Sequence, residues 1–202
     1  VTLALGPMAD VSTEPRWGRI NGTFGEDSEL VSSLTKSYIT GLQGDILNDE
    51  SVASMVKHFP GSGALDGGKD SHFPPGIQSY RGGNFEYHIK PFEEAIEIGV
   101  SSIMTYYSLP IGITKEEVGA GYNSELLLGL LRGKYAFDGI ICTDWAIISD
   151  IILPDGKVVK PASAYGVENL NISERLEKVV MSGVDLIGGE NLTNELVKLI
   201  ES

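Results

Sequence analysis

Polar and charged side chains follow several apolar runs of the sequence at the point where each run ends. The clearest example is Asp144 with Trp145, directly after the apolar run 140–142. In a parallel barrel, a carboxylate at the carboxyl end of a buried strand is typical of a catalytic residue, although Asp144 could instead cap the next helix. The candidate residues at such ends are Asp10, Arg19, Lys57, His58, Tyr107, Asp144 and Trp145.

If these groups meet at one edge of the fold, their chemistry suits a polyhydroxylated ligand. Donors such as Lys57 and His58 can each hold a hydroxyl, and Trp145 offers a flat apolar face for a sugar ring. The Asp144 carboxylate, kept ionised by nearby cations, would then attack an anomeric carbon. A retaining glycosidase also needs a second carboxyl group about 5–5.5 Å away, and the sequence offers no obvious candidate. Taken singly, each group also has a structural interpretation, such as a solvated loop end for Lys57 and His58.

Apolar periodicity predicts the elements that would position these groups. Runs with the character of strands are 1–5, 52–59, 100–107, 140–142 and 184–187. Leu30, Leu34, Tyr38 and Leu42 step by four along one face of a helix predicted after the first run. Further helices are predicted over 85–96, from Asn123 or Ser124 to 131, from a cap at Ser173, and over 192–199.

The repeated order of strand, loop and helix predicts an α/β fold with a parallel sheet and helical crossovers. The expected architecture is a (β/α)8-type TIM barrel, which usually needs about 250 residues and eight strands. Five repeats in 202 residues therefore predict one partial catalytic barrel domain over 1–202, with the first strands missing. An open doubly wound sheet is the structural alternative, but no glycine-rich nucleotide loop follows any predicted strand.

The composition excludes several classes of function. A formal net charge of −13 argues against a nucleic-acid partner or an anionic membrane surface. No apolar stretch approaches the roughly 20 residues of a membrane span. The opening sequence, which lacks a starting Met and a basic leader, is expected to be the middle of a longer protein, so localisation is not predicted. The single cysteine, Cys142, is expected to be a core residue.

Histidine spacing predicts neither a metal site nor a cofactor. His58, His72 and His88 lack the paired spacing of metal ligands, and His88 is expected on the exposed face of a helix. The Gly- and Pro-rich stretch 61–83 is predicted to be a functional loop, because structureless segments of that length are seldom idle. It carries Asp70, His72 and Arg81 among its polar residues.

Five motifs in a fixed order carry a resemblance to a known family. They are PRWGR (15–19), FGED (24–27), KHFPG (57–61), MTYY (104–107) and FDGIICTDW (137–145). In order and approximate spacing they resemble glycoside hydrolase family 3, and the resemblance covers nearly the whole chain. The segment GGKDSHF that follows KHFPG is most similar to the β-glucosidase branch.

The resemblance implies a barrel followed by an α/β sandwich domain of the same protein. It also implies retaining, exo-acting hydrolysis of β-linked glucosides or oligosaccharides from their non-reducing end. By position, Asp144 matches the family's nucleophile and Tyr107 the tyrosine beside it. Trp145 matches the aromatic residue that flanks the terminal sugar and the next subsite. The residues that match those holding the terminal sugar's hydroxyls are Arg19, Lys57 and His58. Asp10 does not match the family's other sugar-binding Asp and is expected to be structural.

The resemblance leaves the general acid/base open. In the β-glucosidase branch it is a Glu from the following domain, which favours Asp70 and His72 as residues that shape the loop or contact sugar. In the N-acetylglucosaminidase branch it is a His in an Asp-x-His dyad, and Asp70 and His72 have that form. However, the sequence Gly-Ser-Gly at 61–63 departs from that branch's usual Gly-His-Gly. The remaining alternatives are a catalytically silent sugar-binding barrel and a phosphate-binding barrel, the latter without the usual glycine-rich loop.

Overall fold

The computed structural model describes residues 1–80 and 84–201. Arg81, which the sequence places in the predicted functional loop, lies outside the described residues. The remainder of that loop contains short 3-10 turns and one short strand rather than a structureless segment. These elements are η2 (Ser62–Ala64), η3 (Asp66–Gly68) and β3 (Ile77–Ser79), which pairs with β5 (Leu109–Ile111) in a parallel two-stranded sheet.

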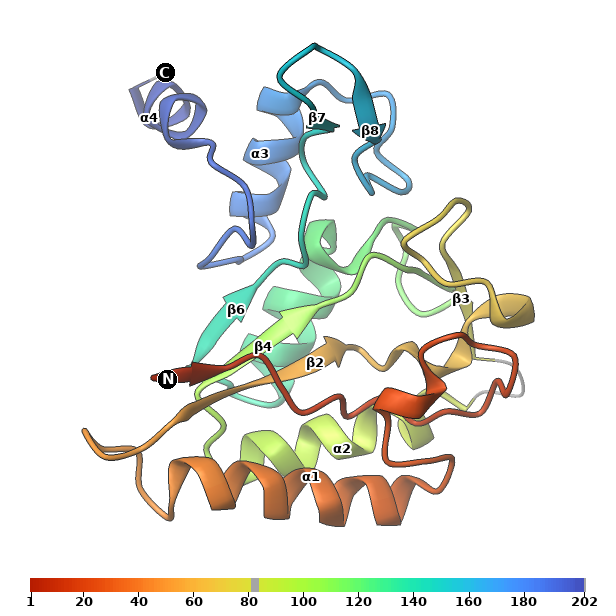
Figure 1. Cartoon of the computed structure of the whole chain (residues 1–202), viewed down its shortest axis with the longest axis vertical. Helices are drawn as coiled ribbons and strands as arrows, with labels where there is room; N and C mark the ends of the chain where they lie inside the picture. Colours follow the sequence, from red (N-terminus) through yellow and green to blue (C-terminus); the bar gives the residue numbers. More distant parts are fainter. Residues whose placement is uncertain (81–83, 202) are drawn as a thin grey trace.

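The centre of the fold is a parallel four-stranded sheet with the order β1-β2-β4-β6 (Figure 1). Its strands are β1 (Leu3–Ala4), β2 (Ala53–Phe59), β4 (Ser102–Thr105) and β6 (Ile140–Cys142). Each connection between neighbours carries a helix, as a parallel ladder requires. The predicted α/β class and parallel sheet are thus present, and residues 1–80 and 84–201 form no closed barrel.

The predicted fifth strand, 184–187, does not form as an extended element. Leu186 makes a single parallel bridge with Cys142, supported by the Thr143 N–H, which donates to the Leu186 carbonyl at 3.0 Å. The Asp185 carboxylate accepts a bond from the Ile141 N–H at 2.7 Å and pairs with Arg132. Three backbone hydrogen bonds and the Asp185 side chain therefore join residues 185–186 to residues 141–143 without a full strand ladder.

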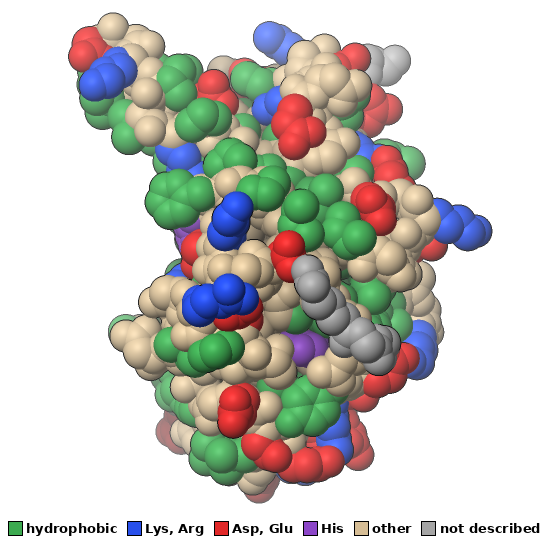
Figure 2. Space-filling view, turned by 90° about the vertical axis from the view of Figure 1, so that its right-hand side faces the viewer, with side chains coloured by type: hydrophobic (Ala, Val, Ile, Leu, Met, Phe, Trp, Pro, Cys, Tyr) green, Lys and Arg blue, Asp and Glu red, His purple; other side chains and the backbone are tan. Residues whose placement is uncertain are grey.

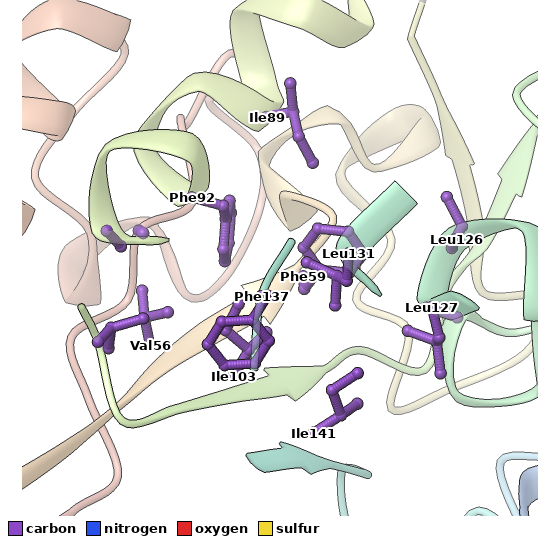
Figure 3. Close-up of a cluster of buried hydrophobic side chains, with 14 of the residues drawn as sticks. Val56, Phe59, Ile89, Phe92, Ile103, Leu126, Leu127, Leu131, Phe137 and Ile141 are labelled. Carbon is purple, nitrogen blue, oxygen red and sulfur yellow. The ribbon is translucent and has the colours of Figure 1, made fainter. Parts of the chain in front are cut away.

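Two helices cover one face of this sheet. They are α1 (Ser28–Gln43) and α2 (Phe85–Glu97), which lie side by side beneath β2 in Figure 1. The core between them and the sheet is built from branched and aromatic side chains (Figure 3), among them Phe59, Phe92, Ile103 and Ile141. Leu127 and Leu131 of the π-helical segment η5 (Glu125–Lys134) complete it. Figure 2 shows acidic side chains gathered on the lower part of the molecule, where α1 and α2 lie.

The apolar stripe predicted on α1 faces outward. Leu30, Leu34 and Tyr38 are all exposed, whereas Val31, Thr35 and Ile39 form the buried face. The buried face includes polar residues, so the outer stripe gives the stronger apolar signal in the sequence. The helix itself is confirmed, and its first turn is capped by Asp27, whose side chain accepts from the Leu30 N–H at 2.8 Å.

Two further predictions about helices are wrong. The N-cap of α3 (Ile172–Met181) is Asn171 rather than Ser173, and Asn171 forms a reciprocal capping box with Glu174. His88 is not on an exposed face of α2, because its side chain is buried and its Nε2 lies 3.2 Å from the Thr13 hydroxyl.

The remaining elements are short turns, a hairpin and the last helix. They are the 3-10 turns η1 (Ile20–Gly22) and η4 (Ala120–Tyr122), the antiparallel hairpin β7 (Ile151–Ile152) and β8 (Val158–Lys160), and α4 (Thr193–Glu201). Figure 1 shows the hairpin, α3 and α4 above the ends of β4 and β6, away from α1 and α2. Across 1–80 and 84–201, none of the helices combines the length and apolar character needed to cross a bilayer.

Candidate active site

Most of the predicted site residues line one small cavity at the carboxyl ends of the parallel strands. The cavity has a volume of about 200 Å³. Its lining residues are Leu5, Arg19, Lys57, His58, His72, Met104, Asp144 and Trp145. Tyr107 and Asp70 are not in the lining, and each contacts a residue that is.

Asp144 lies immediately beyond β6, and neighbours on three sides fix its carboxylate. The Trp145 N–H donates to its Oδ1 at 2.7 Å, and the Tyr107 hydroxyl hydrogen-bonds to the same carboxylate. His58 Nε2 lies 4.0 Å from its Oδ2. Burial together with the neighbouring Asp144 charge raises the pKa of Tyr107, so this hydroxyl keeps its proton and acts as a donor. Asp144 is thus an oriented carboxylate with one side facing the cavity.

Asp10 contacts both the backbone and the imidazole ring of His58. Its fully buried carboxylate accepts bonds from the backbone N–H groups of Ser62 at 2.6 Å and His58 at 3.2 Å, and lies 2.9 Å from His58 Nδ1. Burial alone would raise the pKa of Asp10, but the interaction with His58 and these hydrogen bonds outweigh it and lower the pKa. The predicted structural role of Asp10 therefore has a definite form, which is to orient the imidazole toward Asp144.

Arg19 and Lys57 bring positive charge to the same cavity. Arg19 donates to the Tyr106 hydroxyl at 3.3 Å, and its guanidinium lies 5.8 Å from the centre of that ring. Lys57 is part-buried at the end of β2, where the register against β4 shifts. Burial and the nearby Arg19 charge lower the pKa of Lys57, while Asp144 and Asp10 oppose that shift. Both side chains are cationic donors that line the cavity, and their contact with hydroxyl groups of a ligand stays a prediction.

Asp70 and His72 form the dyad that their spacing suggests. His72 Nδ1 lies 2.5 Å from Asp70 Oδ1, and the indole N–H of Trp17 donates to the other carboxylate oxygen at 2.8 Å. Burial opposes ionisation of Asp70, yet the bonds from His72 and Trp17 outweigh it and hold the pKa of Asp70 well below its usual range. The His72 side chain is 36% exposed and meets the Tyr107 ring edge-on at 4.7 Å. The dyad thus joins the cavity beside Asp144.

Trp145 offers the open aromatic face that the sequence predicts. Its side chain is 38% exposed, and the indole packs against the backbone of Gly188 and Gly189. A Cβ atom at Gly189, where φ is +66°, would lie 2.0 Å from the indole Cδ1. Only glycine allows this approach, so the segment 188–189 sets the position of the Trp145 ring.

Three residues near the site were missed by the sequence reasoning. Tyr106 links Arg19 to the dyad, since its hydroxyl also lies 3.3 Å from Asp70 Oδ1. Glu190 accepts from the N–H groups of Ile148 and Ser149 at 2.9 and 2.8 Å and so fixes the loop after Trp145. Glu190 could have been found, because it follows the run 184–187.

Lys160, the third missed residue, lies at the end of β8 and gives no comparable signal in the sequence. For a metal ion, the described part of the chain shows no group of three or more His, Cys, Asp or Glu side chains that could hold one.

Comparison with known proteins finds a matching family and several similar proteins. The family described as "Glycosyl hydrolase family 3 N terminal domain" matches residues 1–201. The probable beta-glucosidase C of Aspergillus oryzae is 46% identical over 202 residues, which cover 100% of this chain and 31% of that protein. The periplasmic beta-glucosidase/beta-xylosidase of Dickeya chrysanthemi is 43% identical over 216 residues, covering 100% of this chain and 33% of that protein.

A solved structure gives the same picture. The beta-glucosidase of Listeria innocua, in complex with isofagomine, superposes with a TM-score of 0.78 at 27% identity, over 98% of this chain and 26% of that one. The chain therefore spans about a third of the length of the curated relatives it matches.

Proposed function

We propose that this chain, which belongs to glycoside hydrolase family 3, supplies the nucleophile and most of the sugar-binding groups of a retaining, exo-acting β-glycosidase. The observation that carries the proposal is the environment of Asp144. Its carboxylate is oriented by Tyr107 and the Trp145 N–H, and it shares a cavity with Lys57 and other cationic and hydroxyl-binding groups. A buried carboxylate in that setting is suited to attack a carbon atom rather than to serve as a surface ion pair.

The proposed substrate is a β-linked glucoside or oligosaccharide, bound by its non-reducing end. Arg19, Lys57 and His58 would hold the hydroxyls of the terminal sugar, and the exposed face of Trp145 would stack on a sugar ring. The names of the Aspergillus and Dickeya relatives support a β-glucoside or β-xyloside.

The proposed mechanism has two steps. Asp144 attacks the anomeric carbon while the leaving-group oxygen takes a proton from a general acid, which gives a covalent glycosyl ester. Water, deprotonated by the conjugate base of that acid, then attacks the same carbon and releases the Asp144 carboxylate and the sugar. His58 and Tyr107 would stabilise the carboxylate before attack and after release.

The Asp70–His72 dyad favours a second candidate, an enzyme of the N-acetylglucosaminidase type in which His72 is the acid/base. Its support is the 2.5 Å contact between the two side chains and the place of His72 in the same cavity as Asp144. In the first candidate, a Glu from a following domain is the acid/base. His72→Ala separates them. If His72 is the acid, hydrolysis of an alkyl β-glycoside falls far more than that of a 2,4-dinitrophenyl β-glycoside, and otherwise both change alike.

We also propose that residues 1–202 are part of one catalytic (β/α)8-type barrel domain, completed by preceding strands and followed by an α/β sandwich domain. The parallel order β1-β2-β4-β6 and the greater length of the relatives support this architecture.

The experiment that tests the proposed function is trapping of the glycosyl ester. The intact protein is treated with 2,4-dinitrophenyl 2-deoxy-2-fluoro-β-glucoside, and peptide mass spectrometry locates the label. We expect a label on Asp144 that is absent in Asp144→Asn and retained in the control Asp138→Asn, because Asp138 is exposed on the same segment. Sugar binding without any label would support the silent sugar-binding barrel. A label on another residue would refute the assignment of the nucleophile.

A further inference from the structure

Lys160 is the least exposed residue of a hairpin that is otherwise open to solvent. Residues 151–159 are all exposed, including the apolar Ile152 and Val159, whereas Lys160 is part-buried. Charged side chains usually stay in water and apolar side chains are usually buried, and here the arrangement is reversed. Local interactions must therefore hold the Lys160 side chain in place.

The structure supplies that interaction through Tyr107. Lys160 Nζ lies 4.5 Å from the centre of the Tyr107 ring, within the range of a cation–π contact. The same ring is nearly buried and is met edge-on by His72. Its hydroxyl is the one that hydrogen-bonds to Asp144. Lys160 thus touches the group that orients the proposed nucleophile.

Carboxylates from three separate segments act on the Lys160 ammonium. Burial lowers the pKa of Lys160, while the charges of Asp144, Asp70 and Glu190 raise it and only partly offset the burial. Among residues 1–80 and 84–201, Nζ has neither a hydrogen bond nor an ion pair, so its charge acts on these carboxylates at longer range. The Lys160 ammonium therefore lies near carboxylates from three segments, in addition to the Lys57 ammonium at the end of β2.

We infer that Lys160 is a positioning residue for the reaction at Asp144. Its ammonium fixes the Tyr107 ring in the orientation in which the hydroxyl donates to Asp144, and its charge favours the ionised state of the surrounding carboxylates. This inference rests on the proposed role of Asp144 as nucleophile.

The test uses Lys160→Met, Lys160→Arg and the exposed hairpin control Lys157→Met in the intact protein. The pH profile of kcat/KM is measured with 4-nitrophenyl β-glucoside and with cellobiose. We expect Lys160→Met to lower kcat/KM about tenfold on both substrates, the size of a part-buried cation–π contact. In this variant the acid limb of the pH profile of kcat/KM should move to higher pH. Lys160→Arg should restore both kcat/KM and the position of the acid limb, because a guanidinium also binds an aromatic face. Lys157→Met should match the parent in both.

A double-mutant cycle with Tyr107→Phe isolates the route of action. Because Lys160 acts on the hydroxyl of Tyr107, Lys160→Met should lower kcat/KM much less in the Tyr107→Phe background. Additive effects, or an unchanged acid limb in Lys160→Met, overturn the inference. So does a loss confined to cellobiose, which would mark a contact to the leaving sugar. Failure of the unmodified protein to label at Asp144 would instead overturn the proposed function itself.

Discussion

Replacing Asp10 with Asn changes one atom in a buried position and should disable His58. The Asn side chain keeps the volume of Asp10 and one oxygen, which can still accept from the N–H groups of Ser62 and His58. The second oxygen, 2.9 Å from His58 Nδ1, becomes an NH2 donor. The imidazole must then accept at Nδ1, so it cannot carry protons on both nitrogens, and the Asp10 carboxylate that would favour a cation facing Asp144 at 4.0 Å is gone.

The size of the effect follows from the bond that is lost. A hydrogen bond to a charged, buried group contributes about 1.5–3 kcal/mol, so we expect Asp10→Asn to lower the free energy of unfolding by that order. If a comparable interaction, about 2 kcal/mol, is lost in the transition state, kcat/KM falls about 30-fold. The change should appear in both kcat and KM, because His58 lines the cavity and is proposed both to hold a sugar hydroxyl and to act on Asp144.

The assay is hydrolysis of 4-nitrophenyl β-glucoside together with urea unfolding. Ser62→Ala is the control, because it keeps the backbone N–H bound to Asp10 and removes only a hydroxyl that lies 3.4 Å from the His58 carbonyl. Since the folded pKa of Asp10 is lowered, its stabilisation is present above the unfolded pKa near 3.9 and is lost as pH falls through the folded pKa. Asp10→Asn should lack that loss. A kcat/KM within twofold of the parent would refute the reasoning.

Three further predictions concern single side chains. Gly189→Ala should raise KM for aryl glucosides several-fold, because the added Cβ displaces Trp145. The control Gly67→Ala, where φ is +65° and the space around the Cβ is open, should change stability alone. Equal KM values for the two variants would contradict this prediction. Burial lowers the pKa of His88 to about 4, so the urea midpoint should fall as pH drops from 6.5 toward 4, and His88→Gln should flatten that slope. Asn171→Ala should lower the free energy of unfolding by about 1 kcal/mol, and Asn171→Asp should not.

The sequence predicts strand ends well because burial on both faces leaves a continuous apolar signal. In the run 140–142, Ile141 and Cys142 are buried and only Ile140 is exposed, and the structure places Asp144 at the predicted edge. The outer face of α1 shows the opposite situation. Leu34 and Tyr38 repeat at helical spacing yet face outward, because periodicity identifies a stripe but not the side that packs.

Contacts across long sequence separations could not be predicted. Asp10 and His58 are 48 residues apart, and nothing in either local pattern indicates that one supports the other. Lys160 belongs to a hairpin whose exposed residues resemble an ordinary surface loop. Its contact with Tyr107 depends on where the hairpin lies over the strand ends.

The buried carboxylate of Asp10 also has a kinetic consequence for the backbone. The Ser62 amide, 2.6 Å from that carboxylate, and the His58 amide are held by an acceptor that lies wholly inside the fold. Local fraying cannot release them, because their acceptor belongs to a different segment of the chain. Their hydrogen–deuterium exchange should therefore proceed through sub-global or global opening. The exchange rates of these two amides would then report how often the segment around His58 separates from Asp10.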